Sequence, residues 1–285
     1  MGETFVETFV ETEMARFHYS RTGSGPPVVL LPGAGGWRFT FEGLIPVLAR
    51  RRTVYAVDPP GQGLTEILDP GFAYGTDGIV RSLGGFLDAV GLQRTAIVGH
   101  SWGGGFALRL GELHPDRVTR LALLAPGGLD VKDVWEFRVA RLPVVGELGV
   151  RLAPRISARH MLEKSFAHRD RVPHHRLDDL VRTMQSPHHR AARLRDLLRV
   201  ERSVNWAGTE RDLHLTDVPV LLLWGDRDRY LPARLIERFT AELPRVDAHV
   251  LPGAGHSLHD DCPDLTHALL LPFLEAEQSL EVDRG

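Results

Sequence analysis

The residues of this chain that are best placed to do chemistry lie in a Gly-x-Ser-x-Gly pentapeptide centred on Ser101. A short apolar run precedes the pentapeptide, and small, helix-forming residues follow it. This order predicts a strand, a sharp turn and a helix, with the serine exposed at the apex of the turn. Glycines on both sides of the serine remove side chains that would collide in so tight a turn. The helix N-terminus beneath the serine favours negative charge. The pentapeptide therefore predicts a serine nucleophile.

A serine hydroxyl is a weak nucleophile at neutral pH, so it needs a neighbouring base and a carboxylate that orients this base. We expect His256 to be the base, because it follows a short strand and a Gly-Ala-Gly sequence that lets the loop approach the serine. We expect the carboxylate to be Asp228, in the loop after the preceding strand, with Asp226 and Asp130 as alternatives. The chain order Ser, Asp, His is the order that this arrangement takes on a parallel sheet.

Acyl transfer also needs preorganised donors for the oxyanion of its tetrahedral intermediate. We expect these donors to be the backbone N–H groups of Trp102, directly after the nucleophile, and of Ala34, in a glycine-rich turn after an apolar strand. That turn is a poor candidate for a phosphate loop, because no lysine follows it at the required spacing. The predicted substrate-binding residues are Gly33, Gly35, Trp37, His100 and Trp206. We also expect His100 to support the nucleophile turn by hydrogen bonding.

The elements that must position these residues alternate along the chain. Two segments with alternating apolar and polar residues, 4–13 and 15–19, predict antiparallel edge strands. Buried strands are predicted at 28–31, 53–57, before Ser101, and at 118–124, 218–223 and 249–251. Helices are predicted between them, from the turn at 33–36 to about residue 50, at 76–90, after Ser101, at 232–243 and at 263–276. This alternation predicts an α/β fold with a mostly parallel, eight-stranded sheet, helices on both faces and a site at the carboxyl ends of the strands.

The alternation stops between residues 127 and 215, where amphipathic helical patterns such as 180–198 occur without a clear buried strand. Structureless connections of this length are uncommon. We therefore interpret residues 127–215 as a helical lid inserted after the sixth strand, and residues 1–126 and 216–285 as the core domain.

Composition narrows the class of protein. The 285 residues are 43% hydrophobic and 25% charged, as in ordinary globular proteins, and the net charge of -3 gives no general attraction to nucleic acid or to an anionic membrane. Cys262 is the single cysteine, so no intrachain disulfide can form. The N-terminal residues are acidic and contain no apolar stretch, which argues against a secretory signal, and no run reaches the roughly 18–20 apolar residues of a membrane span. We expect a cytoplasmic protein with a small-molecule substrate and no cofactor or metal; monomer and homodimer both remain open.

Five motifs in a fixed order resemble those of the α/β-hydrolase superfamily, over about residues 28–278. They are Leu30-Leu31-Pro32-Gly33, Asp58-Pro59-Pro60-Gly61-Gln62-Gly63, Gly99-His100-Ser101-Trp102-Gly103-Gly104, Trp224-Gly225-Asp226-Arg227-Asp228 and Gly253-Ala254-Gly255-His256. In this family the acid usually lies three residues after the glycine of the Trp-Gly pair, which here is Asp228. Two positions bear on the comparison: Pro32 replaces a usual histidine of the oxyanion loop, and Ser101 stands where dehalogenases and epoxide hydrolases have aspartate.

The residues and the resemblance together predict a serine hydrolase that cleaves an ester or lactone of a small, largely apolar molecule through an acyl-enzyme. Hydrolysis of a carbon–carbon bond in a diketone is the nearest variant, because related lidded members do this with the same triad. Two alternatives use the same fold. The chain could be a cyclase or lyase with His256 as base, or a ligand sensor that signals through its lid. Covalent labelling of Ser101 and the turnover rate discriminate among these functions.

Overall fold

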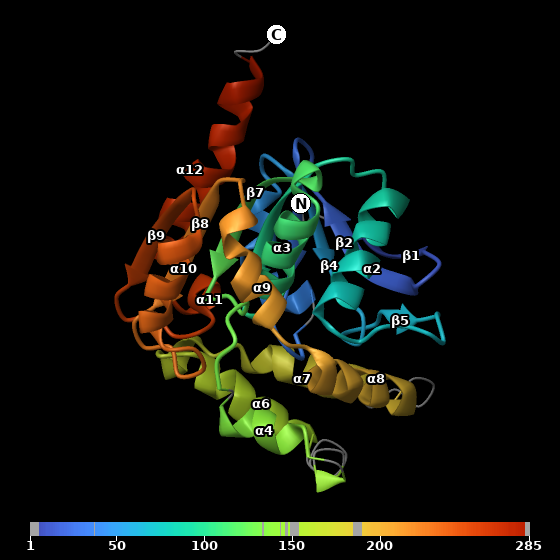
Figure 1. Cartoon of the computed structure of the whole chain (residues 1–285). Helices are drawn as coiled ribbons and strands as arrows, with labels where there is room; N and C mark the ends of the chain where they lie inside the picture. Colours follow the sequence, from blue (N-terminus) through green and yellow to red (C-terminus); the bar gives the residue numbers. More distant parts are fainter. Residues whose placement is uncertain are drawn as a thin grey trace.

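The computed structural model describes residues 6–36, 38–132, 134–142, 144–145, 148, 154–184 and 190–282. Its centre is a sheet in which eight strands follow the order β1-β2-β4-β3-β6-β7-β8-β9 (Figure 1). These strands are β1 (Val6–Glu11), β2 (Ala15–Thr22), β3 (Pro27–Leu31), β4 (Thr53–Val57), β6 (Thr95–His100), β7 (Val118–Leu124), β8 (Val220–Gly225) and β9 (Val246–Leu251). The pairs β1–β2 and β2–β4 are antiparallel, and the pairs from β4 to β9 are parallel. The predicted α/β sheet is confirmed.

One further strand was not predicted. The short β5 (Glu66–Ile67) pairs with β2 in antiparallel orientation, through the register Ala15 to Ile67 and Arg16 to Glu66. A segment of two residues has no periodicity, so the sequence carries no signal for it. The bounds of β4 and β7 are as predicted. Other strands differ from the prediction by a few residues, and β9 starts three residues earlier than expected.

Helices flank the sheet (Figure 1). They include α1 (Ile45–Leu48), α2 (Thr76–Ala89), α3 (Trp102–Leu113), α10 (Ile236–Glu242), α11 (Leu258–Asp261) and α12 (Pro263–Val282). The long helix expected up to about residue 50 is wrong: the chain forms a 3-10 turn at Arg38–Phe41 and then the short α1. Pro46 explains this, because a proline is tolerated in the first turn of a helix and not in its interior.

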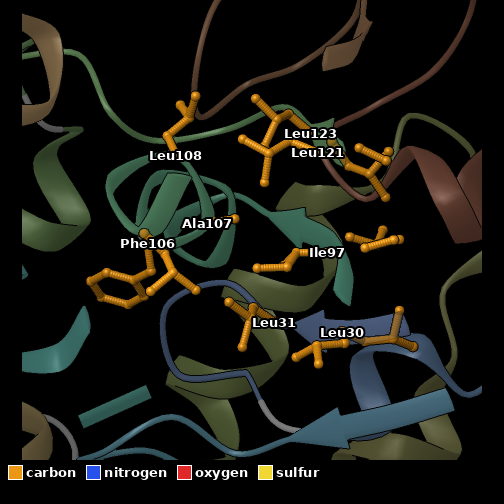
Figure 2. Packing of buried hydrophobic residues seen from close by; sticks show 14 of the residues in the cluster. Leu30, Leu31, Ile97, Phe106, Ala107, Leu108, Leu121 and Leu123 are labelled. Atoms are coloured by element: carbon orange, nitrogen blue, oxygen red, sulfur yellow. The ribbon is translucent and has the colours of Figure 1, made fainter. Parts of the chain in front are cut away.

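The hydrophobic core packs α3 against the middle of the sheet. Leucine and isoleucine side chains of β3, β6 and β7 pack with the apolar side chains of α3 (Figure 2). The labelled members are at most 1% exposed and comprise Leu30, Leu31, Ile97, Phe106, Ala107, Leu108, Leu121 and Leu123. Full burial of one large apolar side chain contributes about 1.5–3 kcal/mol. The connection from β6 to α3, which contains Ser101, therefore joins two firmly packed elements.

A helical segment separates β7 from β8, and we call residues 127–215 the helical insertion. It carries α4 (Trp135–Ala140), α6 (Pro154–Ser165), α7 (His174–Met184), α8 (Arg190–Ser203) and α9 (Ala207–Asp212). Helices α4, α6, α7 and α8 lie together beyond one end of the sheet, at the bottom of Figure 1. The pattern predicted over 180–198 belongs to two helices, since α7 ends at Met184 and α8 begins at Arg190. Within the described ranges, every helix is too short or too polar to cross a bilayer.

Candidate active site

The turn that carries Ser101 is strained and tightly held. Ser101 has φ 52° and ψ -120°, a left-handed backbone conformation that is costly for a residue with a Cβ. Its N–H donates to the carbonyl oxygen of Leu124 at 3.0 Å, and its carbonyl oxygen accepts from the N–H groups of Gly105 at 3.1 Å and Gly127 at 2.7 Å. Strand β7 and the chain that follows it thus fix the serine in this conformation. Ser101 is 9% exposed at the carboxyl end of β6.

Close backbone approaches explain the glycines around the serine. A Cβ on Gly99 would lie 2.5 Å from the carbonyl oxygen of Gly103, inside any normal contact distance. A Cβ on Gly33 would lie 2.9 Å from the Cβ of Ser101 and 3.1 Å from Nδ1 of His100. The turn after β3 therefore lies directly against the serine, as the predicted oxyanion site requires.

His256 and Asp228 form a buried hydrogen-bonded pair. Nδ1 of His256 lies 2.7 Å from Oδ2 of Asp228, and the two side chains are 7% and 0% exposed. The other carboxylate oxygen, Oδ1, accepts from the backbone N–H groups of Tyr230 at 2.7 Å and Leu231 at 2.9 Å. These contacts fix the carboxylate as an acceptor, so Nδ1 of the neutral imidazole carries the proton. Nε2 is then the nitrogen with a free lone pair.

The alternative aspartates have other partners. Asp226 is exposed, and its Oδ1 accepts from the backbone N–H of Gly253 at 2.7 Å. Asp130 is exposed too, and its backbone N–H donates to a carboxylate oxygen of Glu210 at 2.9 Å. Of the three aspartates considered from the sequence, Asp228 is the one whose carboxylate meets His256.

His100 is buried between the nucleophile turn and the base. Its Nε2 lies 3.1 Å from the backbone carbonyl oxygen of His256, and its ring centroid lies 4.8 Å from that of His256 and 5.0 Å from that of His259. Burial lowers the pKa of His100 well below its ordinary value, and the two neighbouring imidazoles lower this pKa further. His100 is therefore neutral near pH 7. Its observed contacts support the site, while its predicted contact with substrate stays a prediction.

The two predicted oxyanion donors belong to different elements, Trp102 to the start of α3 and Ala34 to the turn after β3. Trp102 is the first residue of α3, so its N–H is one of the groups that a helix leaves without an intrahelical acceptor. Ala34 lies in the turn after β3, which is closed by a hydrogen bond from the N–H of Gly36 to the carbonyl of Gly33 at 2.9 Å. Gly35 is exposed and has φ 65°, which favours glycine.

Two tryptophans were predicted to bind substrate. Trp37 lies outside the described residues. The Trp206 ring packs against the backbone of α3: a Cβ on Gly105 would lie 2.5 Å from this ring, and the ring centroid lies 5.4 Å from that of Phe106. The described contacts of Trp206 support α3, and a substrate contact of Trp206 remains a prediction.

Aromatic side chains lie next to His256, and one of them, Tyr230, was not predicted from the sequence. The ring of Tyr230 lies 5.1 Å from that of His256. Phe137, from α4 of the helical insertion, lies 6.1 Å from Tyr230 and 6.2 Å from Trp102, nearly parallel to the latter ring. Burial raises the pKa of Tyr230 above its ordinary value, so its phenol stays neutral. Tyr230 follows Asp228 by two residues, and nothing in that spacing marks it as functional.

Comparison with known proteins gives the family. The family model described as "alpha/beta hydrolase fold" matches residues 26–263. Haloalkane dehalogenase 2 of Mycobacterium tuberculosis is 27% identical over 279 residues, covering 94% of each chain. A 2-hydroxy-6-oxo-6-phenylhexa-2,4-dienoate hydrolase of Burkholderia cepacia is 26% identical over 271 residues, covering 91% of each chain.

A solved structure agrees with this match. The 2-hydroxy-6-oxo-6-phenylhexa-2,4-dienoate hydrolase from Rhodococcus sp. strain RHA1 superposes with a TM-score of 0.79 and 21% identity, over 98% of this chain and 100% of that one. The superfamily predicted from the five sequence motifs is thereby confirmed. The chain belongs to the α/β-hydrolase fold family.

Proposed function

We propose that this protein is a hydrolase of small, largely apolar molecules and that Ser101, His256 and Asp228 form its catalytic triad. The observation that carries the proposal is the 2.7 Å contact between Nδ1 of His256 and Oδ2 of Asp228. This contact sets the tautomer that leaves Nε2 to accept a proton from Ser101. The strained turn at Ser101 supports the role of nucleophile.

The proposed reaction has two halves. Ser101 Oγ attacks a carbonyl carbon while Nε2 of His256 takes the hydroxyl proton, and Asp228 stabilises the imidazolium. His256 then gives this proton to the leaving group, and the acyl group stays on Ser101. Water, activated by His256 in the same way, releases the acid and restores the hydroxyl. These steps use protein groups and water alone.

The backbone N–H groups of Ala34 and Trp102 are the proposed oxyanion donors. The position of Gly33 against Ser101 supports this proposal, because it brings the turn after β3 to the nucleophile. One such donor contributes about 3 kcal/mol to stabilising the transition state. Pro32, where related enzymes commonly have histidine, lies before these donors and takes no part in proton transfer.

An ester or lactone with an apolar, aromatic acyl part is the proposed substrate class. The rings of Trp102, Phe137 and Tyr230 adjoin the triad and offer flat apolar surfaces. Phe137 belongs to the helical insertion, and we propose residues 127–215 as a lid on a core of residues 1–126 and 216–285. Hydrolysis of a carbon–carbon bond is the second candidate. It is favoured by the similarity to the 2-hydroxy-6-oxo-6-phenylhexa-2,4-dienoate hydrolase of Burkholderia cepacia.

Dehalogenation is disfavoured by the chemistry of Ser101, although one relative is a haloalkane dehalogenase. A serine that displaces a halide from an alkyl carbon forms an ether, which water does not cleave under mild conditions. An aspartate at this position forms an ester instead, and water can hydrolyse that ester. Ser101 is therefore suited to carbonyl substrates, where its product is itself an ester.

A substrate panel tests the proposal. The panel holds p-nitrophenyl esters of graded acyl length, aryl esters, lactones and a phenyl-bearing oxodienoate, with Ser101→Ala as control. We expect hydrolysis of at least one class by the wild type and its loss in the variant. Absence of turnover across the panel would favour the cyclase, lyase or sensor alternatives. Equal turnover by Ser101→Ala would exclude the proposed nucleophile.

A further inference from the structure

Asp261, at the end of α11, is a fully buried carboxylate with every acceptor position in use. Its Oδ2 accepts from the backbone N–H groups of Gly255 at 2.6 Å and Ala167 at 2.9 Å. Its Oδ1 accepts from the backbone N–H of His168 at 3.0 Å and lies 2.9 Å from Nδ1 of the same histidine. The side chain is 0% exposed. A buried carboxylate is tolerated when it is saturated with donors in this way.

The donors come from two distant parts of the chain. Gly255 directly precedes His256, the proposed catalytic base, whereas Ala167 and His168 follow α6 of the helical insertion. One carboxylate thus ties the backbone of the insertion to the backbone of the His256 loop.

Neighbouring contacts extend this connection, and we call residues 161–168 the anchor segment. The N–H of Ser257 donates to the carbonyl oxygen of Ser165 at 3.0 Å. The hydroxyl of Tyr230 donates to the carbonyl oxygen of Met161 at 3.0 Å. The anchor segment therefore bonds both to the loop of His256 and to the loop of Asp228.

Gly255 shows how closely the two backbones approach. A Cβ at this position would lie 2.6 Å from the carbonyl oxygen of Ser165 and 2.7 Å from the backbone nitrogen of Ala167. Any larger residue would push the anchor segment away from the His256 loop. The second glycine of the Gly-Ala-Gly sequence is thus needed for contact with the insertion.

The same cluster resembles a metal site at first sight. Ligand atoms of His168, Asp261 and Cys262 lie within 4.8 Å of one another. The carboxylate, however, is surrounded by N–H groups whose positive ends point at it, and a cation would have to displace them. Burial also raises the pKa of the Cys262 thiol, which disfavours the thiolate that metals require. Hydrogen bonding accounts for the cluster.

We infer that Asp261 is a positioning residue that sets the His256 loop and makes docking of the anchor segment part of the catalytic geometry. This inference rests on the proposed function. His256 must hold Nδ1 on Asp228 while Nε2 serves Ser101, and the residue before it is fixed by Asp261. A shift of about 1 Å in such a group is enough to lower a rate by about two orders of magnitude.

The test measures the rate at which a fluorophosphonate labels Ser101, per folded molecule, together with kcat, KM and the pH profile of ester hydrolysis. Asp261→Asn turns one acceptor into an NH2 group that faces the N–H donors. We expect its labelling rate and kcat to fall by at least about 30-fold, with full labelling at the end point and a smaller change in KM. Asp226→Asn is the matched control: it removes a carboxylate charge from the neighbouring loop, keeps an amide oxygen that can accept from the N–H of Gly253, and does not touch the insertion. We expect a change below about threefold.

A second variant acts from the side of the insertion. His168→Ala removes the side-chain donor to Asp261 and should lower the labelling rate by about threefold to tenfold. Because both residues act through one carboxylate, the double variant should be no slower than Asp261→Asn alone. If Asp261→Asn fails to fold, His168→Ala decides the question.

Three outcomes overturn the inference. The first is that Asp261→Asn is labelled at the wild-type rate per folded molecule. The second is that its labelling rate falls only in proportion to the unfolded fraction, while kcat and the pH profile of the folded molecules are unchanged. The third applies if Asp261→Asn does not fold, and it is that His168→Ala is labelled at the wild-type rate. In each case the wild type is labelled at Ser101, so the proposed function survives. An unlabelled wild type overturns the proposed function and this inference with it.

Discussion

His100 donates a hydrogen bond from Nε2 to the backbone carbonyl oxygen of His256, across 3.1 Å. A carbonyl oxygen can only accept, so this contact assigns the proton of the neutral ring to Nε2. The residue directly before the proposed nucleophile therefore holds the loop of the proposed base. Nδ1 of His100 is buried without a hydrogen-bond partner among the described residues and faces the turn at Gly33.

Removing this connection should slow the reaction. We expect His100→Leu to lower kcat/KM by about tenfold or more, because the loop of His256 loses its hydrogen bond to the nucleophile turn. His100→Gln, which can keep an amide donor near the same position, should lose less. Initial rates with the best ester of the panel measure both effects. Equal rates for wild type and His100→Leu would show that the contact is dispensable.

The choice of acid is open to a direct comparison. Asp228→Asn should lower kcat by about 10⁴-fold, because an amide at this position favours the wrong tautomer of His256. Asp226→Asn should leave kcat nearly unchanged, because this carboxylate bonds Gly253 instead. Ser101→Ala and His256→Ala should each lose several orders of magnitude in kcat, since triad members act as a unit. If Asp226→Asn lost activity and Asp228→Asn kept it, Asp226 and not Asp228 would be the acid of the triad.

The oxyanion turn offers a matched pair of glycines. Gly33→Ala places a Cβ 2.9 Å from Cβ of Ser101, so the turn must move and kcat should fall by about 100-fold. Among the described residues, a Cβ on Gly35 meets nothing within 4 Å, and its φ of 65° is the obstacle that the structure shows. Gly35→Ala should therefore cost about 1 kcal/mol of stability and lower kcat less than Gly33→Ala does. Steady-state kinetics and urea unfolding separate the two effects; an active Gly33→Ala would contradict the tight contact.

The strained backbone of Ser101 should be visible in stability. Ser101→Gly relieves the positive φ, whereas Ser101→Ala keeps the Cβ and the strain. We expect Ser101→Gly to be more stable than Ser101→Ala by about 1 kcal/mol, although both are inactive. Urea denaturation midpoints measure the difference. A less stable glycine variant would show that chain entropy outweighs the strain.

Glu112 makes stability depend on pH in a defined direction. Burial raises the pKa of Glu112 to about 8, with Asp212 and Asp77 adding to the effect and Arg109 opposing it. The folded state therefore keeps a proton that the unfolded chain releases above the ordinary glutamate pKa of 4.5, so stability falls as pH rises from 4.5 toward 8. Glu112→Gln should remove up to about 1.4 kcal/mol per pH unit from this slope. Urea unfolding at pH 5, 6, 7 and 8 measures it, and unchanged slopes would refute the shift.

The sheet and the nucleophile turn were predictable because their signals are local. Buried strands such as β4 and β7 are mostly apolar runs. The nucleophile turn needs glycines at fixed offsets from Ser101. The carboxylate that meets His256 was also expected, because the chain order and the spacing after Trp224-Gly225 favour Asp228.

The rest depends on how distant segments pack. Tyr230 and Asp261 gain their contacts from the anchor segment, about 60 to 100 residues away in the sequence, and no spacing within their own loops announces this. The short α1 was missed because one helix was expected from the turn at 33–36 to about residue 50, across Pro46. β5 has two residues and rests on pairing with β2 alone. Long-range packing, which a single sequence does not display, decides the contacts of Tyr230 and Asp261 and the pairing of β5.

The most direct test of the proposed triad is mass spectrometry of the protein after treatment with a fluorophosphonate. We predict one adduct per chain, on the peptide that contains Ser101, with no adduct in Ser101→Ala and slow labelling in His256→Ala. Absence of an adduct in the folded wild type, or an adduct that persists in Ser101→Ala, would contradict the proposal.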